Sequence, residues 1–263
     1  MEAETSRLSA AEIYDRVELG GKQELDRPLH NLFISAVSAG LAMGISGFGV
    51  AVLLHVLGGD GASEAVAFLA YPLGFLVVII GRQQLFTENT LFPVTLVLDQ
   101  RRLLAATARL WAVVLTGNVL GTLLFAVLAT QTPALAPAVT QELSSLGVEA
   151  ASHGFATVFW TGVIGGWLIA LVGWLVTAST DTVGQVLIIF VMTYVVGVGH
   201  FAHSVAGSGE ALAAVLSGDL PLQSYLTWFA GAVLGNTAGG VLIVALFAYG
   251  QVHQEPDRQD AGE

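Results

Sequence analysis

Two long apolar stretches of this chain are each interrupted by a short polar run, and this feature restricts the fold more than any other. The first interruption begins at Gly81, in GRQQLFTENTLFPVTLVL, and the second begins at Gly199, in GHFAHSVAGSGEALAAVL. Irregular backbone and polar side chains are tolerated at membrane depth only where protein or a water-filled cavity covers them. The interruptions therefore predict two helices that are broken inside a membrane and that share one pore or binding site.

Composition supports a membrane location. Hydrophobic residues make up 54% of the 263 residues and charged residues only 11%, whereas soluble proteins contain roughly a quarter charged residues. The formal net charge of -11 argues against nucleic acid as a partner. The chain has no cysteine, which excludes disulfides, thiolate metal sites and cysteine catalysis. We expect no metal site and no cofactor.

The apolar runs predict an all-α membrane protein with six transmembrane helices, at ~20 residues per crossing. The second and fifth helices are the broken ones. The predicted spans are about 32–57, 65–98, 104–130, 155–178, 183–216 and 225–250. Residues 29–250 would form the channel domain, between acidic tails at 1–28 and 251–263 that we expect to be solvated. We expect residues 131–153 to form a loop.

The basic residues predict the orientation. With six spans, all of the Lys and Arg residues except Arg82 fall on one side of the membrane. Because positive charge concentrates on the cytoplasmic side, both termini are expected in the cytoplasm, with the protein in the inner or plasma membrane. Arg82 would lie inside the bilayer, where a charge costs ~3 kcal/mol or more. It would therefore either pair with Glu88 or Glu210 or attract an anion toward the pore.

The chain also contains an internal repeat. A Gly-Asn dipeptide follows each break at the same spacing, at Gly117-Asn118 and Gly235-Asn236, and FISAVSAGLAMGISGF from Phe33 aligns with FWTGVIGGWLIALVGW from Phe159. Three spans per copy is an odd number, so the second copy (about 155–250) is inverted relative to the first (about 32–130). Asn118 and Asn236 are expected to hydrogen-bond carbonyl groups of the breaks.

The motifs in the two breaks resemble those of the formate/nitrite transporter family. Leu85–Thr90 reads LFTENT and looks like the family's LFTxNT loop, and Phe201–Ala206 reads FAHSVA and looks like its FEHSxAN segment. The resemblance implies an aquaporin-like protomer and a pentamer with one pore per protomer. It also implies transport of small monovalent weak-acid anions such as formate, nitrite or hydrosulfide.

The resemblance assigns roles to individual residues. His203 matches the pore histidine that is thought to handle a proton, and Thr87 matches the threonine of the first loop. Four residues fall on or beside apolar constrictions: Tyr71, Phe75, Leu85 and Phe86. Five more match structural positions: Asn89, Ser204, Gly207, Asn118 and Asn236. The chain departs from the family at Ala202 and Gly166 and has no lysine within 131–178, so the substrate within this class stays open.

The polar residues of the breaks also allow other interpretations. His203 could be an interior histidine bonded to the backbone, and burial would favour its neutral ring. His200 could join it as a metal ligand, but two ligands are too few for a metal site. If Glu88 and Glu210 were unpaired and ionised, they would repel an anion, so we expect each to be paired or protonated.

Two classes of function remain after these assignments. The leading interpretation is a channel for a small monovalent anion or its conjugate acid. The alternative is an aquaporin-like pore for a small neutral solute, although the chain has no Asn-Pro-Ala motif. We expect no enzymatic activity, because the sequence has no nucleotide-binding loop and no Ser/His/Asp arrangement.

Overall fold

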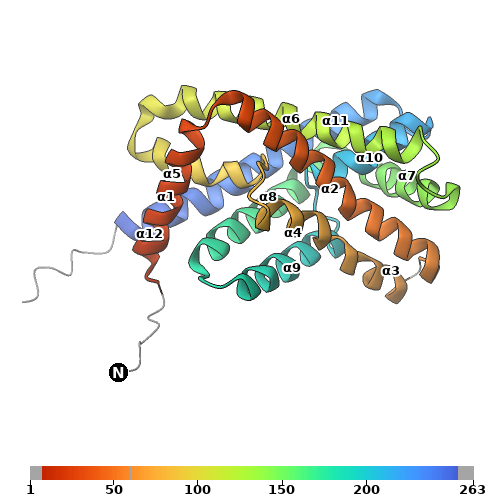
Figure 1. The fold of residues 1–263 in the computed structure, drawn as a ribbon, viewed down its shortest axis with the longest axis horizontal. Coiled ribbons are helices and arrows are strands. Elements are labelled where there is room, and N and C mark those ends of the chain that lie inside the picture. Colours follow the sequence, from red (N-terminus) through yellow and green to blue (C-terminus); the bar gives the residue numbers. More distant parts are fainter. Residues whose placement is uncertain (1–7, 60, 254–263) are drawn as a thin grey trace, which may run out of the picture.

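The computed structural model describes residues 8–59 and 61–253. The regular elements among these residues are all helices (Figure 1). In chain order they are α1 (Ala10–Asp26), α2 (Leu29–Leu57), α3 (Ala62–Ala67), η1 (Phe68–Ala70), α4 (Pro72–Ile80), η2 (Glu88–Thr90), α5 (Phe92–Asp99), η3 (Arg101–Leu103), α6 (Leu104–Thr130), α7 (Pro137–Ala151), α8 (Phe155–Ala178), α9 (Thr182–Val198), α10 (Ala206–Ser217), α11 (Leu222–Ala238), η4 (Gly239–Ala245, a π-helix) and α12 (Leu246–His253).

Several helices are long and apolar enough to cross a membrane. Within the described residues they are Leu29–Leu57, Ala62–Ile80, Arg101–Thr130, Phe155–Ala178 and Leu222–Val252. The apolar helix α9 is shorter and is followed, after a break, by α10. The sequence-based prediction of an all-helical membrane fold is confirmed, and these segments are consistent with six spans.

The N-terminal segment differs from the solvated tail that its polar composition predicts. Helix α1 begins with a capping box, in which the Ser9 hydroxyl accepts from the Glu12 N–H and the Glu12 carboxylate accepts from the Ser9 N–H. The Ser9 N–H and the Ser9 hydroxyl both donate to the Glu12 carboxylate and lower the pKa of this group. Tyr14, Val17 and Gly21 are buried, and α1 lies beside α5 and α12 (Figure 1). The segment is therefore a packed helix.

The prediction of a loop over residues 131–153 was wrong for most of that range. Pro137 occupies the first turn of α7, where its missing N–H costs no hydrogen bond. Helix α7 packs along α10. Gly147 allows this contact, because a Cβ at this position would collide with the backbone of Glu210.

The two breaks have the same backbone geometry. The N–H of Gly81 donates to the Val77 carbonyl, and the N–H of Gly199 donates to the Val195 carbonyl, each at 3.0 Å. The next residues, Arg82 and His200, both have positive φ angles, of 53° and 50°. A left-handed backbone is uncommon outside glycine. Its occurrence at equivalent positions therefore shows that the internal repeat is structural.

Asn118 of α6 holds the first break in place. Its side-chain nitrogen donates to the carbonyls of Ala36 and Gln84, both at 2.8 Å, and its side-chain oxygen accepts from the N–H of Phe86 at 2.9 Å. One buried amide thus satisfies three backbone groups, one in α2 and two in the break, and ties the break to α2.

Asn236 of α11 does the same for the second break. It donates to the carbonyls of Gly162 at 2.9 Å and Ala202 at 2.8 Å, and it accepts from the N–H of Ser204 at 2.8 Å. The sequence-based prediction that both asparagines bond carbonyls of the breaks is confirmed. Since unpaired backbone groups are costly away from water, these bonds explain how irregular backbone persists inside the bundle.

Two aligned glycines bring the helices close enough for these bonds. A Cβ on Gly40 would collide with the backbone of Asn118, and a Cβ on Gly166 would collide with the backbone of Asn236. Small residues at such crossings let helix backbones approach closely. The repeat seen in the sequence therefore corresponds to two equivalent contacts, α2 with α6 and α8 with α11.

Candidate functional site

The two breaks meet at a hydrogen bond between Thr87 and His203. The Thr87 Oγ1 and His203 Nε2 atoms are 2.9 Å apart. The other ring nitrogen, Nδ1, accepts from the backbone N–H of Ala206 at 3.0 Å. Because Nδ1 is an acceptor, the neutral ring carries its hydrogen on Nε2 and donates it to Thr87. The hydroxyl hydrogen of Thr87 is then directed toward another acceptor.

The surroundings of this pair favour a neutral imidazole. His203 is 2% exposed and Thr87 is 0% exposed. The ring of Phe75 lies edge-on to the His203 ring, with centroids 5.0 Å apart. A second proton on Nδ1 would require the bond from Ala206 to open, and a buried cation without a partner is costly. The ring can therefore hold a second proton only when the local structure changes or an anion binds.

The four residues assigned to constrictions are all buried. The Tyr71 and Phe75 rings lie 5.5 Å apart, and the Phe75 ring in turn contacts the His203 ring. Phe86 instead packs edge-on against Trp111 of α6, at 5.9 Å, and Leu85 lies beneath the cavity described below. Phe75 thus contacts the His203 ring and Leu85 lines the cavity, whereas Phe86 belongs partly to the contact with α6.

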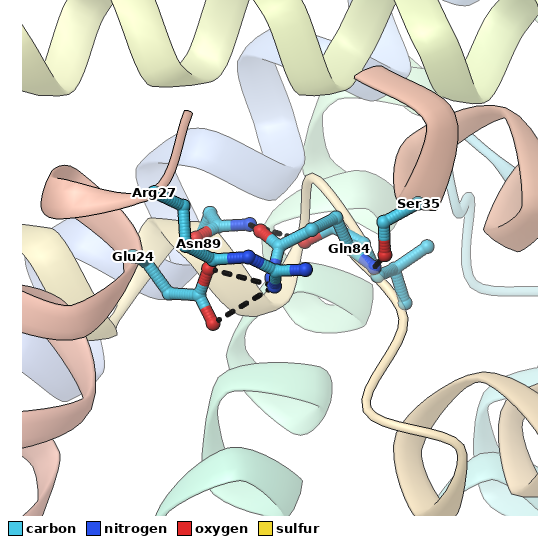
Figure 2. A network of polar contacts seen from close by, with 6 residues as sticks. Glu24, Arg27, Ser35, Gln84 and Asn89 are labelled. Atoms are coloured by element: carbon cyan, nitrogen blue, oxygen red, sulfur yellow. Dashed lines mark hydrogen bonds and ion pairs between the residues drawn. The ribbon is translucent and has the colours of Figure 1, made fainter. Parts of the chain in front are cut away.

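Gln84 organises the first break, although no sequence motif assigns it a role. Its backbone N–H donates to Ser35 Oγ at 3.1 Å, and its side-chain oxygen accepts from Asn89 Nδ2 at 3.1 Å (Figure 2). The Asn89 carbonyl accepts from Trp111 Nε1 at 2.8 Å. A polar residue within an apolar stretch was the signal that could have identified Gln84.

A cavity of about 330 Å³ lies between α1 and the first break. The break contributes Arg82, Gln83 and Glu88, and α1 contributes Arg16 and Glu24. Glu24 also pairs with Arg27 at 3.1 Å (Figure 2). Leu85 lines the cavity floor, while Thr87 and His203 do not reach it. The cavity therefore forms a vestibule on the α1 side of Leu85.

Arg82 is exposed at this vestibule. Among the described residues, the ion pairs within 4.0 Å are Lys22–Glu18, Arg27–Glu24 and His200–Glu64, so Arg82 pairs with neither Glu88 nor Glu210. Glu88 lines the same vestibule. Glu210 lies elsewhere, on α10, where its side chain packs over Gly47 of α2.

The remaining residues of the second break lie apart from the vestibule. His200 faces Glu64, with His200 Nε2 and Glu64 Oε1 3.4 Å apart. Gly207 lies against the ring of Trp228, which leaves no room for a side chain. The Ser204 hydroxyl is buried and has no hydrogen-bond partner among the described residues. Within that part of the chain, no group of three or more His, Asp or Glu residues could hold a metal ion.

Paired broken helices, buried polar groups at their junction and a vestibule define a membrane transport protein. The chain belongs to the formate/nitrite transporter family, because the model of that family, described as "Formate/nitrite transporter", matches residues 11–250. The match includes most of α1 as well as the spans. Members of this family are transporters and not enzymes.

Individual relatives agree with this assignment. The chain is 32% identical over 257 residues to "Inner membrane protein YfdC" of Escherichia coli (strain K12), covering 97% of this chain and 82% of that protein. It is 29% identical over 203 residues to "Probable formate transporter" of Methanothermobacter thermautotrophicus, covering 70% of this chain and 74% of that protein.

Solved structures show the same fold. A chain described as "FNT family ion channel" has a TM-score of 0.77 at 22% identity and covers 92% of this chain and 96% of its own. A chain described as "Pentameric formate channel with formate bound" has a TM-score of 0.70 at 19% identity, with coverages of 86% and 97%. The fold expected from the sequence is therefore that of known channels.

Proposed function

We propose that this protein conducts a small monovalent anion or its conjugate weak acid, and that the anion meets a proton at the His203–Thr87 pair. One observation carries the proposal: the two breaks place an imidazole and a hydroxyl 2.9 Å apart in a buried junction beside the Phe75 ring. A relative named as a probable formate transporter and a similar fold described with bound formate support an anion of this size.

The apolar residues explain why a proton is needed. A bare anion that passes Leu85 and Phe75 loses its hydration at a cost of several kcal/mol or more, whereas the neutral acid loses far less. The Nε2–H of His203 already donates to the Thr87 oxygen and is not available to the anion. The hydroxyl hydrogen of Thr87 is therefore the donor that the anion meets first. Donation by Thr87 aligns the anion for proton transfer.

The His203 ring can complete this transfer as a relay. A hydronium ion gives a proton to Nδ1 and becomes water, once the hydrogen bond from the Ala206 N–H to Nδ1 has opened. The Nε2 proton then passes to the Thr87 oxygen as the hydroxyl proton of Thr87 passes to the anion. The products are the neutral acid and a neutral imidazole, so charge and protons balance. The anion itself favours the cationic ring as it approaches.

Flux measurements test this function directly. The protein is placed in proteoliposomes, and uptake of labelled formate, nitrite, lactate and glycerol is measured with and without a pH gradient. We expect formate or nitrite uptake that increases when the side of entry is acidic. Uptake of glycerol alone, with no response to the gradient, would instead favour a pore for neutral solutes.

Assembly and orientation form part of the same proposal. Large apolar side chains are exposed on the helices, for example Ile34 at 66% and Leu234 at 54%, and such faces need lipid or another protomer. We propose a pentamer with one pore per protomer, located in the inner or plasma membrane. Native mass spectrometry in mild detergent should give five copies, and a stable monomer or dimer would contradict this.

We further propose that residues 29–250 form the channel domain, with residues 1–28 and 251–263 on the cytoplasmic side. The distribution of Lys and Arg supports this orientation. Single cysteines introduced near each terminus should react with a membrane-impermeant maleimide in inverted vesicles but not in intact cells. Labelling in intact cells would reverse the orientation.

A further inference from the structure

We propose that His200 and Glu64 form a titratable anion-entry site at the mouth opposite α1, separate from the His203–Thr87 pair. The inference rests on the proposed transport of anions. The site would bind a small monovalent anion such as a carboxylate, and it would do so when His200 is protonated.

Contacts fix the position of His200 at this mouth. Its Nε2 lies 3.4 Å from Oε1 of Glu64, and its ring lies edge-on to Phe68 with centroids 5.1 Å apart. The side chains of His200 and Glu64 are 47% and 38% exposed, so the rest of the chain does not bury them. An ordered imidazole that remains accessible to solvent can exchange protons and also contact an incoming solute.

A column of aromatic rings connects this site to the pore pair. Phe68 lies 6.2 Å from Tyr71, Tyr71 lies 5.5 Å from Phe75, and Phe75 lies 5.0 Å from His203, measured between ring centroids. With the contact between His200 and Phe68, the rings run without a gap from one histidine to the other. The entry site is therefore continuous with the wall of the proposed passage.

The internal repeat places His200 opposite Arg82. The two residues occupy equivalent positions and share the left-handed backbone, with φ of 50° and 53°. Helix α9 has 17 residues, which span about 25 Å at 1.5 Å per residue. Gln185 near its start lines the vestibule that contains Arg82, and His200 follows its end. One mouth thus has a permanent cation, and the other has a cation that depends on pH.

The charges around His200 give the direction of the pH effect. Glu64 of α3 is the only carboxylate on the described helices α2, α3, α4, α8 and α9, and Glu210 of α10 packs over Gly47 and interacts electrostatically with Tyr71 of the aromatic column. The other titratable groups here are Tyr194 of α9, which donates to the Ala65 carbonyl at 3.3 Å, Tyr71 beside η1, and His55 at the end of α2. Asp60 lies outside the described residues.

Protonation of His200 therefore changes the net charge of the His200–Glu64 pair from negative to neutral. With a neutral ring, the ionised Glu64 leaves this mouth negative and repels an anion. With a protonated ring, the pair is neutral and the N–H groups of His200 can donate to the anion. Capture of an anion from this side should therefore weaken when the His200 ring is neutral.

Sided kinetics test the site. Formate flux is measured in proteoliposomes of defined orientation, and KM and kcat are determined for entry from each side at about pH 5.5 and 7.5. We expect KM from the His200 side to rise about threefold or more over this range, with no such rise from the Arg82 side. His200→Asn should abolish the rise without lowering kcat, since asparagine tolerates a left-handed backbone. Glu64→Gln should lower KM at pH 7.5.

His55→Asn is the matched control, because His55 is also a histidine near the end of a helix on this side of the bundle. It should leave the KM profile unchanged. The proposal is overturned if His200→Asn keeps the wild-type change of KM with pH, or if His55→Asn removes it.

A binding measurement separates this inference from the proposed function. NMR spectra of the protein with labelled histidine are recorded in nanodiscs, and the His200 signal is assigned by its loss in His200→Asn. At about pH 5.5, added formate should shift this signal saturably. If the signal shifts while no anion is transported, the proposed function fails and the site stands. If anions are transported and formate leaves the signal in place, the site is rejected.

Discussion

Leu85 and His203 occupy equivalent positions in the two breaks. The Leu85 carbonyl accepts from the N–H of Asn89 at 3.2 Å, and the His203 carbonyl accepts from the N–H of Gly207 at 3.0 Å. The backbones match, but one repeat presents an apolar side chain and the other an imidazole. In the proposed mechanism, a solute from the vestibule meets Leu85, loses water there, and then meets the His203–Thr87 pair.

Shortening Leu85 should widen the passage on the vestibule side. We predict that Leu85→Ala raises lactate flux relative to formate flux by roughly tenfold, because an apolar constriction excludes larger hydrated solutes. Labelled uptake in proteoliposomes measures the ratio. Leu73→Ala is the control, since Leu73 is an exposed leucine of α4. An unchanged ratio in an assembled Leu85→Ala variant would place the constriction elsewhere.

The hydroxyl group of Thr87 should be needed for flux. We predict that Thr87→Val, which keeps the size of the side chain, lowers formate flux about tenfold or more, equivalent to ~1.4 kcal/mol in the barrier. Thr87→Ser keeps the hydroxyl and should retain most of the activity. Equal flux in the valine and serine variants would show that Thr87 only fills space.

The side chain of Asn236 should be essential for stability. Asn236→Leu leaves the carbonyls of Gly162 and Ala202 and the N–H of Ser204 without their hydrogen-bond partner. Each buried backbone group without a partner costs roughly 1–3 kcal/mol of stability. We expect a lower melting temperature in detergent and a poor yield of assembled protein. Asn31→Leu, at an exposed position of α2, is the control and should melt as wild type does.

The close contact between α8 and α11 leads us to predict that Gly166 is also needed for stability. We expect Gly166→Ala to lower the melting temperature clearly, because its Cβ would collide with the backbone of Asn236, which cannot move aside easily. Gly154→Ala places a Cβ in open space at the start of α8 and serves as the control. Identical melting of the two variants would mean that the helices can separate at little cost.

The sequence predicted the breaks, the repeat and the asparagine contacts, because each depends on residue type at a fixed spacing. It did not predict α1 or α7 as packed helices. Their polar composition suggested a tail and a loop, although the pattern Ser9-Ala-Ala-Glu12 is a capping box and could have indicated the start of α1. Tertiary contacts, which composition does not encode, hold both helices on the bundle.

The sequence named the residues of the candidate site but not their geometry. The family motifs pointed to His203 and Thr87, yet the tautomer depends on the direction of the Ala206 N–H, which no motif specifies. The expectation that Arg82 lies within the bilayer took no account of the vestibule, which α1, the first break, α8 and α9 line together. Long-range packing thus determines the environment of residues that the sequence had already identified.

The pH profile of flux through His203→Asn tests the central claim most directly. Asparagine keeps a polar side chain at this position but cannot titrate. Wild-type and variant proteoliposomes that contain equal amounts of assembled protein are compared for formate and nitrite uptake from about pH 5 to 8. We predict that the variant passes at least tenfold less substrate at neutral pH, ~1.4 kcal/mol or more in the barrier, and that its flux no longer depends on pH. An assembled variant with the wild-type flux and pH profile would remove His203 from the mechanism.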